Sequence, residues 1–252
     1  MARPVEHRVE VLGVGIDPLT VEGLHAEIEN LVCGAQHGLV LNVNAHCLNL
    51  CYEDSALREF VNGAEVVFCD GAGVRLAARM LGGRIPERIT YADWIWHLAD
   101  LASARGFSLY LLGARPGVAQ QAAKRLRERY PDLELVGVHH GYFDHSAGSP
   151  DNEAVVEGIN TSAPDILLIG LGMPLQERWL MQNRQRLDFG VALTGGAVFD
   201  YASGRLRRGP RFLTEHGFEW LARLLVEPRR LWRRYLIGNP LFLLRVLKQR
   251  LS

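Results

Sequence analysis

The stretch Glu65-Val-Val-Phe-Cys-Asp-Gly-Ala-Gly-Val-Arg75 organises the interpretation of the whole chain. Its run Val66-Val-Phe68 has the length and β-branching of a buried strand, and a helical pattern of apolar residues follows. Between strand and helix stand one acid, Asp70, and two glycines, Gly71 and Gly73. Open α/β sheets bind ligands where a strand ends and the chain turns into a helix. Asp70 is therefore a candidate general base, with helix N-capping as its alternative role.

Outward from this stretch, short apolar runs alternate with amphipathic helical patterns along most of the chain. Strands are predicted at residues 9–14, 39–43, 66–68, 107–112, 133–138, 165–170 and 189–193. Helices are predicted between them, including one over residues 91–105. This alternation predicts an α/β fold with a Rossmann-like, mostly parallel sheet covered by helices on both faces.

The charge of the chain is unevenly distributed although its formal sum is zero. Residues 1–203 carry 16 Lys/Arg and 25 Asp/Glu, a net −9, whereas residues 204–252 carry 12 Lys/Arg and 3 Asp/Glu, a net +9. We expect an α/β core over residues 1–203 and a basic, amphipathic helical C-terminal appendage over residues 204–252. A basic tail on an acidic body indicates an anionic partner such as phosphate, nucleic acid or a membrane surface.

The tail itself is predicted to contain helices over residues 217–226, 229–236 and 241–251, with breaks at residues 227–228 and 238–240. The middle helix has a predicted apolar face of Leu231, Trp232, Tyr235 and Leu236, with its arginines largely off that face. Such helices suit interfacial binding to a membrane. Packing on the body with solvated arginines, or subunit contact in a homo-oligomer, would use the same face. No recognised motif supports nucleic-acid binding.

The compartment is predicted to be the cytoplasm. Residues 1–10 are polar and charged, which argues against a signal peptide, and no run reaches the roughly 18 apolar residues of a spanning helix. The four cysteines, Cys33, Cys47, Cys51 and Cys69, lack framework spacing and are predicted to be buried free thiols. No zinc pattern is completed and no Asp-x-Asp triplet occurs, so neither a metal nor a cofactor is predicted.

Polar side chains stand at three predicted strand-to-helix junctions. Asn42, Asn44 and His46 stand at the end of one strand, Asp70 follows the next, and Gln176 and Glu177 follow a third. Parallel strands bring such junctions to the same edge of a sheet, so we expect these side chains to line one cleft.

Glycine-rich turns at residues 113–117, 170–172 and 195–196 suit a diphosphate or nucleotide, although the spaced dinucleotide fingerprint is missing. Arg88 and the tail arginines are the cations that can stabilise a departing diphosphate.

Eight short motifs then occur in a specific order. They are Val43-Asn-Ala-His46, Phe68-Cys-Asp-Gly-Ala-Gly73, Pro86-Glu-Arg-Ile89, Tyr110-Leu-Leu-Gly113, His139-His-Gly-Tyr-Phe143, Gly170-Leu-Gly-Met-Pro-Leu-Gln-Glu-Arg-Trp179, Gly195-Gly-Ala-Val-Phe-Asp200, and Gly217-Phe-Glu-Trp-Leu-Ala-Arg-Leu224 with Glu227-Pro-Arg-Arg230. Through these motifs, roughly residues 8–235 resemble the WecG/TagA/CpsF glycosyltransferases, glycosyltransferase family 26.

The resemblance implies an inverting, metal-independent enzyme without a cofactor. Such an enzyme moves a sugar from a UDP-sugar onto a polyprenyl-diphosphate-linked acceptor in cell-surface polysaccharide or teichoic-acid-type biosynthesis. The sugar would be N-acetylmannosamine, its uronic acid or glucose. The implied location is peripheral, on an anionic membrane surface at the cytoplasmic face.

The resemblance also implies residue roles. Asp70 would be the catalytic base, assisted by Arg88 and Gln176. The predicted substrate-binding residues are Asn42, Asn44, Gly71, Gly73, Gly113, Gly172, Glu177, Arg223, Arg230 and Arg233, of which the last three would reach the diphosphate. Asn42 replaces a threonine that is usual in the family. Residues 89–93 also depart from the family pattern, which suggests a different donor or acceptor sugar.

Two functions from other classes stay open on the residues alone. A nucleotide-binding oxidoreductase can use a similar doubly wound sheet and would bind NAD(P). A non-catalytic membrane-binding scaffold would use only the tail.

Overall fold

The computed structural model describes residues 8–34, 37–215 and 217–251. The strands are β1 (Val9–Val11), β2 (Val14–Ile16), β3 (Gly38–Val43), β4 (Val66–Cys69), β5 (Leu109–Gly113), β6 (Leu135–His139), β7 (Ile166–Gly170) and β8 (Val191–Thr194). The helices are α1 (Val21–Val32), α2 (Ala45–Glu53), α3 (Ser55–Asn62), α4 (Ala72–Met80), α5 (Tyr91–Arg105), α6 (Val118–Arg129), α7 (Pro150–Ser162), α8 (Leu175–Asn183), α9 (Val198–Ala202), α10 (Arg211–Glu215), α11 (Glu219–Val226), α12 (Pro228–Trp232) and α13 (Gly238–Leu251). A 3₁₀ turn (Arg184–Arg186) follows α8, and a π-helical turn (Arg233–Ile237) joins α12 to α13.

Six strands form one sheet in the order β4-β3-β8-β7-β5-β6, and β1 pairs with β2 in a separate antiparallel ribbon. β8 runs parallel to β3 and β7, and β5 runs parallel to β7 and β6. Strands β3, β4, β5, β7 and β8 are buried along their whole length, as expected where helices cover both faces of a sheet. The predicted α/β fold with a mostly parallel sheet is confirmed.

The chain divides into two compact units, which are described separately below. The first unit consists of Met1–Val21, Asn42–Thr90 and Arg207–Ser252, and the second consists of Glu22–Leu41 and Tyr91–Leu206. The predicted border at residues 203/204 lies close to the unit border at 206/207. The appendage nevertheless shares its unit with two earlier segments of the chain.

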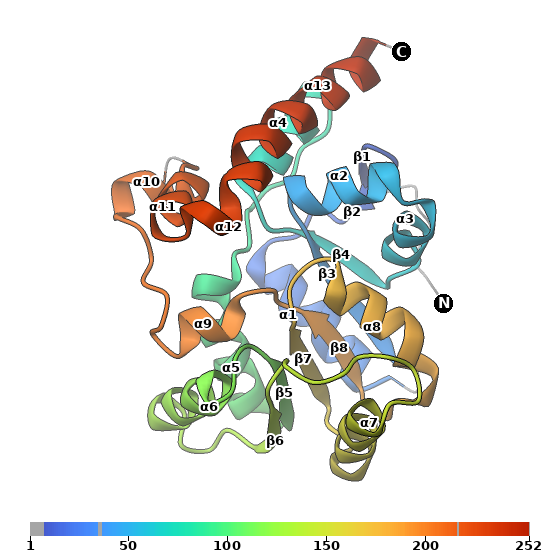
Figure 1. The fold of residues 1–252 in the computed structure, drawn as a ribbon, viewed down its shortest axis with the longest axis vertical. Coiled ribbons are helices and arrows are strands. Elements are labelled where there is room, and N and C mark those ends of the chain that lie inside the picture. Colours follow the sequence, from blue (N-terminus) through green and yellow to red (C-terminus); the bar gives the residue numbers. More distant parts are fainter. Residues whose placement is uncertain (1–7, 35–36, 216, 252) are drawn as a thin grey trace. The chain divides into compact units, whose positions relative to one another are not determined.

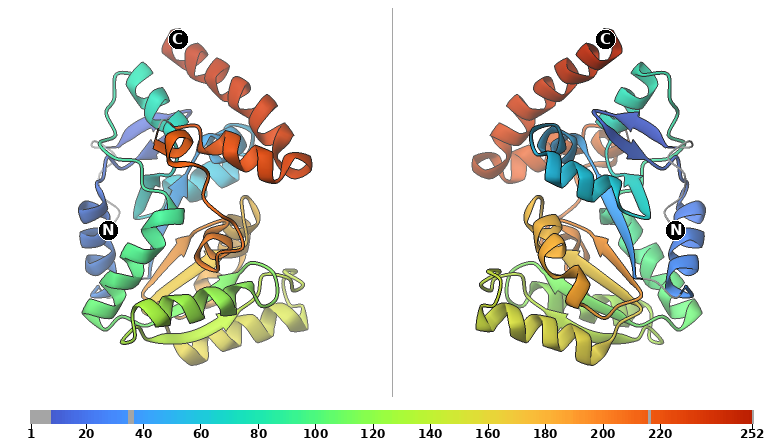
Figure 2. Two further views of the ribbon diagram at one scale, coloured as in Figure 1. Left: turned by 90° about the vertical axis from the view of Figure 1, so that its left-hand side faces the viewer. Right: turned by 90° about the vertical axis from the view of Figure 1, so that its right-hand side faces the viewer.

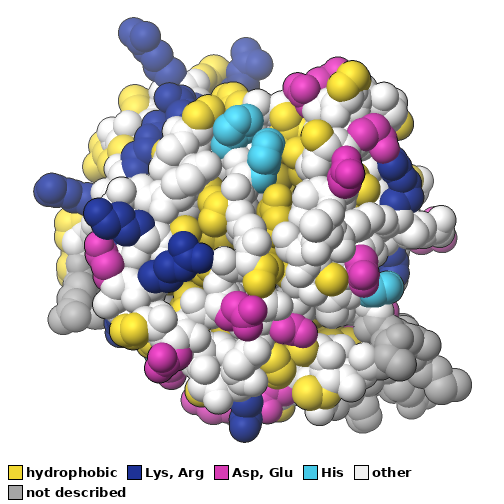
Figure 3. Space-filling model, turned by 90° about the horizontal axis from the view of Figure 1, so that it is seen from below, with side chains coloured by type: hydrophobic (Ala, Val, Ile, Leu, Met, Phe, Trp, Pro, Cys, Tyr) yellow, Lys and Arg dark blue, Asp and Glu magenta, His cyan; other side chains and the backbone are white. Residues whose placement is uncertain are grey.

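In the second unit, helices cover both sides of the strands. Figure 1 shows α6 and α9 on one side of β5 and β7, with α7 and α8 on the other. Trp94 Nε1 donates to His25 Nε2 at 3.0 Å and so links α5 to α1. Arg125 Nη1 donates to the carbonyl of Ala202 at 3.0 Å, linking α6 to α9. Figure 3 shows acidic, basic and apolar side chains interspersed over the face seen from below, as on an ordinary solvated surface.

In the first unit, helix α13 packs against α2 and α4 (Figures 1 and 2). Phe242 and Val246 are its buried residues. Polar contacts add to this packing: Asn49 Nδ2 donates to the carbonyl of Gly238 at 2.8 Å, and Arg245 Nη1 donates to Asn49 Oδ1 at 3.0 Å. The end of the appendage is therefore a packed part of the first unit.

The predicted helix break at residues 238–240 is wrong. Gly238 has helical backbone angles, φ −65° and ψ −39°, and its N–H bonds to the carbonyl of Arg233 in the π-helical turn. Pro240 is the third residue of α13, after the π-helical turn, and it has no N–H to donate back into that turn. The wider turn lets the helical path continue through a sequence that usually ends a helix.

The predicted apolar face of residues 229–236 is also split. Leu231 and Tyr235 are 3% and 8% exposed, whereas Trp232 and Leu236 are 42% and 54% exposed. A helix turns by about 100° per residue, so neighbours in sequence cannot both point fully inward. Two of the four apolar residues pack and the other two face solvent.

The cysteines are free, as predicted. Cys47, Cys51 and Cys69 are buried, but Cys33 is exposed because it follows the last turn of α1 at the surface, so its predicted burial is wrong. None of the described helices is both long and apolar enough to span a membrane.

Candidate active site

Asp70 follows the last residue of β4 and stands beside the end of β3, because its N–H donates to the carbonyl of Val43 at 2.9 Å. Its Oδ2 accepts a hydrogen bond from Asn42 Nδ2 at 3.0 Å. The N-cap of α4 is Gly71, and no side chain caps that helix. The capping alternative for Asp70 is therefore wrong, and the carboxylate is held by the neighbouring strand.

The electrostatic surroundings make Asp70 a stronger base than an ordinary carboxylate. Burial, and then the negative charge of Glu219, raise the pKa of Asp70 to about 7. The Asn42 hydrogen bond and the guanidinium groups of Arg88 and Arg223 act in the opposite direction. A base with a pKa near neutrality combines a deprotonated fraction with useful proton affinity.

The neighbouring thiol does not compete with Asp70 as a reactive group. Burial raises the pKa of Cys69 to about 12, so the thiol stays protonated at neutral pH. A protonated thiol is a poor nucleophile.

Asn44 has a structural role that the sequence did not indicate. It is the N-cap of α2, and its Oδ1 accepts from the N–H groups of His46 and Cys47, both at 3.1 Å. His46 faces the same region, and burial together with the charge of Arg234 lowers its pKa to about 4. His46 is therefore neutral at physiological pH.

The two glycines of the Asp70 motif pack closely against other segments of the unit. A Cβ on Gly71 would lie 3.5 Å from Asn44 Cβ. A Cβ on Gly73 would lie 3.9 Å from both Ala45 Cβ and Phe242 Cε1. Both are ordinary contact distances, so an added methyl group would fit at either position and the packing does not require glycine there.

Arg88 is placed beside Asp70 by its own backbone. The N–H of Ile89 donates to the carbonyl of Cys69 at 3.0 Å, which fastens the segment before α5 to the end of β4. The guanidinium then reaches the appendage: Nη2 donates to the carbonyl of Thr214 at 3.2 Å, and Nη1 lies 3.5 Å from Glu219 Oε2. Arg88 thus joins the Asp70 segment to the appendage.

The three predicted appendage arginines occupy different positions. Arg223 is close enough to Asp70 to lower its pKa. Arg230 is exposed and pairs with Glu227 at 3.0 Å, while the exposed Arg233 lies 5.3 Å from the centroid of the Trp232 ring. Of the three, the structure brings Arg223 to the base.

Arg234 is not one of the three tail arginines that the resemblance assigns to the diphosphate, yet it contacts Asn44 at this site. Its Nη2 donates to Asn44 Oδ1 at 3.4 Å. Its Nε is enclosed and has no hydrogen-bond partner among the described residues. Burial lowers the pKa of Arg234, and the charge of Asp70 opposes that effect. Arg233 and Arg234 are adjacent arginines, so they differ only in the direction in which the helix points each side chain. The sequence does not determine that direction.

The remaining predicted residues lie in the second unit. Gln176 is fully buried, and its Oε1 accepts from the N–H groups of Gly172 at 3.2 Å and Gly196 at 3.0 Å. Its Nε2 donates to Glu177 Oε1 at 2.8 Å. Gln176 therefore ties the turn after β7 to the turn after β8, which is a positioning role.

Glu177 is the second carboxyl with a raised pKa. Burial raises its pKa to about 7, against the effect of the hydrogen bond from Gln176. Its Oε2 is enclosed and finds no hydrogen-bond partner within the described residues. The pKa of Glu177 is set by burial and by hydrogen bonds, including that of Gln176, whereas guanidinium groups also act on the pKa of Asp70.

Gly113 and Gly172 have backbone reasons to be glycine. Gly113 has φ +147°, and a Cβ there would lie 2.4 Å from the carbonyl oxygen of Gly170 on the neighbouring strand. Gly172 has φ +87° in the turn that leads into α8. A side chain would strain both positions.

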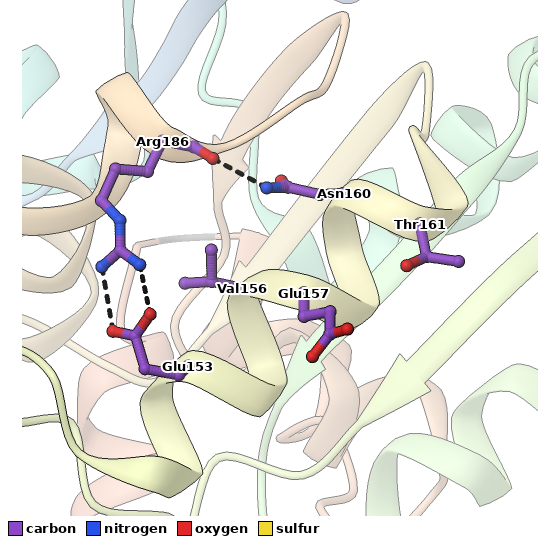
Figure 4. Close-up of a pocket in the computed structure, with 6 residues that line it drawn as sticks. All are labelled: Glu153, Val156, Glu157, Asn160, Thr161 and Arg186. Atoms are coloured by element: carbon purple, nitrogen blue, oxygen red, sulfur yellow. Dashed lines mark hydrogen bonds and ion pairs between the residues drawn. The ribbon is translucent and has the colours of Figure 1, made fainter.

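The second unit also contains a surface hollow of about 480 Å³ beside α7 (Figure 4). It is lined by Glu153, Val156, Glu157, Asn160, Thr161 and Arg186. Arg186 forms a two-fold ion pair with Glu153, and its carbonyl accepts from Asn160 Nδ2 at 2.8 Å. These polar groups satisfy one another, and none of the predicted site residues lines the hollow.

The first unit therefore brings together predicted cleft residues and two residues that were not predicted, Glu219 and Arg234. The predicted ones are Asn42, Asn44, His46, Asp70, Arg88 and Arg223. Gln176, Glu177, Gly113 and Gly172 belong to the second unit. Over the described part of the chain, no group of three or more His, Cys, Asp or Glu side chains could hold a metal ion.

Comparison with known proteins gives one consistent match. A model of the glycosyl transferase WecG/TagA/CpsF family matches residues 9–252. Proteins named N-acetylglucosaminyldiphosphoundecaprenol N-acetyl-beta-D-mannosaminyltransferase from Staphylococcus aureus strains NCTC 8325 and COL are 27% identical to this chain. Each alignment covers 96% of this chain and 92% of the relative, so the similarity extends over both units.

Proposed function

The chain belongs to the glycosyl transferase WecG/TagA/CpsF family, and we propose that it transfers a sugar from a UDP-sugar to a polyprenyl-diphosphate-linked acceptor with inversion. The observation that carries this proposal is Asp70, a carboxyl of raised pKa at the end of a buried strand, facing guanidinium groups from the appendage. The proposed setting is cell-surface polysaccharide or teichoic-acid-type biosynthesis.

Asp70 is the proposed base. Its carboxylate takes the proton of the acceptor hydroxyl as that oxygen attacks the anomeric carbon of the donor sugar. The bond from this carbon to the phosphate oxygen breaks, and UDP leaves with the electron pair. The hydrogen bond from Asn42 holds the carboxylate on one side during this transfer.

Arginines are the proposed partners of the departing diphosphate, so the reaction requires no metal ion. Arg223 and Arg234 both act on the Asp70 carboxyl electrostatically, and the enclosed Nε of Arg234 is a donor without a partner in the described structure. A diphosphate accepts such charge-assisted hydrogen bonds well. Arg230 and Arg233, which are exposed in the same segment, are also proposed to bind the diphosphate.

Residues of the second unit are also proposed to bind substrate. Gln176 fixes the turns that contain Gly172 and Gly196. Gly113, Gly172 and Glu177 keep their proposed place at the substrate, and Gln176 acts on the reaction by holding the turns.

The names of the relatives suggest the first substrates to test. They describe transfer of N-acetylmannosamine to N-acetylglucosaminyl-diphosphoundecaprenol. UDP-N-acetylmannosamine with that lipid-linked acceptor is therefore our first proposed substrate pair, with other UDP-sugars as alternatives.

The appendage is proposed to bind the cytoplasmic face of an anionic membrane. Its exposed apolar residues include Trp232, Leu236, Leu244, Leu247 and Leu251. Basic residues such as Lys248 and Arg250 lie in the same helix as the last three. Anionic lipid attracts each such residue by about 1 kcal/mol near the surface. Contact between subunits of a homo-oligomer is the alternative use of this surface.

The test is release of UDP from a panel of UDP-sugars, with and without the polyprenyl-diphosphate-linked acceptor and with EDTA. We expect acceptor-dependent release that EDTA leaves unchanged. Asp70→Asn should lower kcat by about 10²–10⁴-fold with UDP affinity retained, because only proton transfer is removed. The exposed Asp132→Asn is the matched control.

Turnover of Asp70→Asn at the wild-type rate would contradict Asp70 as the base. Binding of NAD(P) with no release of UDP would support the oxidoreductase alternative. Vesicle binding without any transfer would support the scaffold.

A further inference from the structure

Glu219 is one of three acidic residues in the basic appendage. It is the first residue of α11, and its Oε2 lies 3.5 Å from Arg88 Nη1 and 3.6 Å from Arg208 Nη2. Its side chain is only 17% exposed. An acid held between two guanidinium groups and largely out of water is an organised part of the molecule.

The same ion pair fixes one of the proposed catalytic residues. The Arg88 guanidinium contacts the appendage twice, through Glu219 and through the carbonyl of Thr214. On the other side, the backbone next to Arg88 is fastened to Cys69, the residue before Asp70. The orientation of Arg88 near Asp70 therefore depends on groups that the appendage supplies.

The charges around Asp70 give Glu219 a second effect. Arg88, Arg223 and Arg234 are the cations that act on the Asp70 carboxyl. Glu219 is the carboxylate that acts against them, and it is itself paired with Arg88 and Arg208. Without this negative charge, Asp70 would face the guanidinium groups alone and would be a weaker base.

We propose that Glu219 is a positioning residue that fixes the Arg88 guanidinium and balances the positive charge around Asp70, so that the base is complete only when the appendage is in place. This inference rests on the proposed function for its kinetic readout but not for its structural one. It assigns the appendage an acidic contribution in addition to its arginines.

Two substitutions separate the two effects of Glu219. Glu219→Gln keeps an oxygen that can accept from Arg88 but removes the negative charge. Glu219→Ala removes both. The matched control is Glu53→Gln, because Glu53 also pairs with an appendage arginine, Arg245 at 2.6 Å, but does not act on Asp70.

The kinetic test is the pH profile of kcat/KM for the four proteins. Glu219→Gln should move the acid limb to lower pH by about 0.5–1 unit, because loss of a like charge lowers the pKa of Asp70. Glu219→Ala should show that shift and a lower plateau, because Arg88 also loses an acceptor. Glu53→Gln should leave the limb unchanged. An unmoved limb in Glu219→Gln would overturn the inference, even if its rate falls.

A second measurement does not need activity. Carbon-13 NMR of the Asp70 carboxyl, assigned by its loss in Asp70→Asn, gives the midpoint of its titration without substrate. We expect a lower midpoint in Glu219→Gln than in wild type. An unchanged midpoint in an active enzyme refutes the inference and leaves the proposed function. A lowered midpoint in a protein that transfers no sugar refutes the function and leaves the inference.

Discussion

At the scale of single residues, the two carboxyls whose pKa is raised to about 7 are distinguished by their neighbours. Asp70 lies near guanidinium groups and an asparagine, and these groups stabilise its carboxylate form after the proton has left. Glu177 is enclosed beside a glutamine, with one oxygen that lacks a partner in the described chain. The same raised pKa therefore belongs to a candidate base in one case and to an enclosed carboxyl that titrates near neutral pH in the other.

Asp70→Asn is expected to stabilise the fold at high pH. The pKa of Asp70 is higher in the folded protein than in the unfolded chain, so the native state binds more protons between about pH 4 and pH 7. Stability consequently falls as pH rises through that window, and the asparagine variant lacks this loss. The free energy of unfolding of Asp70→Asn should therefore exceed that of wild type by an amount that grows between about pH 5 and about pH 8. At about pH 8 the difference should be about 1–3 kcal/mol.

Urea unfolding of both proteins at the two pH values measures this gain. Asp132→Asn, at an exposed position, should show no such growth. A gain that is the same at both pH values would contradict a raised pKa for Asp70.

Glu177→Gln and Glu177→Ala are expected to act in opposite directions on stability. The glutamine keeps an acceptor for Gln176 Nε2 and avoids a buried charge, so it should stabilise the protein above about pH 7. The alanine leaves Gln176 without its acceptor and should destabilise by about 1–3 kcal/mol. Thermal unfolding at about pH 8 separates the two outcomes. A Glu177→Gln variant that melts at the wild-type temperature would show that burying the ionised carboxyl does not destabilise the protein.

At the scale of elements, the packing of α13 is expected to depend on its buried side chains. Phe242 is 1% exposed, whereas Leu244 in the same helix is 63% exposed. Phe242→Ala should therefore cost about 3–5 kcal/mol of unfolding free energy, and Leu244→Ala less than about 0.5 kcal/mol. Urea unfolding measures both values. Similar costs for the two variants would mean that α13 is not packed as described.

Periodicity predicted many elements well, and α5 occupies the residues 91–105 that were predicted for it. It failed at residues 238–240 because a glycine and a proline locally favour a break. There the helix is continued by the π-helical turn and by contacts from elsewhere in the chain, such as the hydrogen bond from Asn49 to the carbonyl of Gly238. Propensity is local, and such contacts override it.

The candidate site shows the same limit. The position of Asp70 directly after a strand was predictable because an acid between a strand and two glycines is a local pattern. Arg234 was not, because the packing that turns it inward and Arg233 outward is tertiary. Glu219 was missed because its partner Arg88 lies far away in sequence.

At the scale of the whole molecule, the appendage combines a net charge of +9 with exposed leucines. The double variant Leu244→Ser with Leu247→Ser should lower binding to vesicles that contain anionic lipid by about tenfold or more, because two buried apolar contacts with lipid are lost. Sedimentation with vesicles measures this. Leu76→Ser, which changes a leucine that is 50% exposed on α4, is the matched control.

Unchanged vesicle binding in the double variant would contradict the membrane role of this surface. A change in molecular size without vesicles would then assign the surface to contact between subunits.

The division of the chain into two units has a consequence for its synthesis. The last residue of the second unit is Leu206, whereas the first unit includes Arg207–Ser252. A ribosome therefore releases every segment of the second unit before the first can be completed. Asn42–Thr90, with Asp70, must wait for the final segment to pack against it. The nascent chain should thus gain the second unit first, and the proposed catalytic centre should form later, once residues 207–252 have been synthesised.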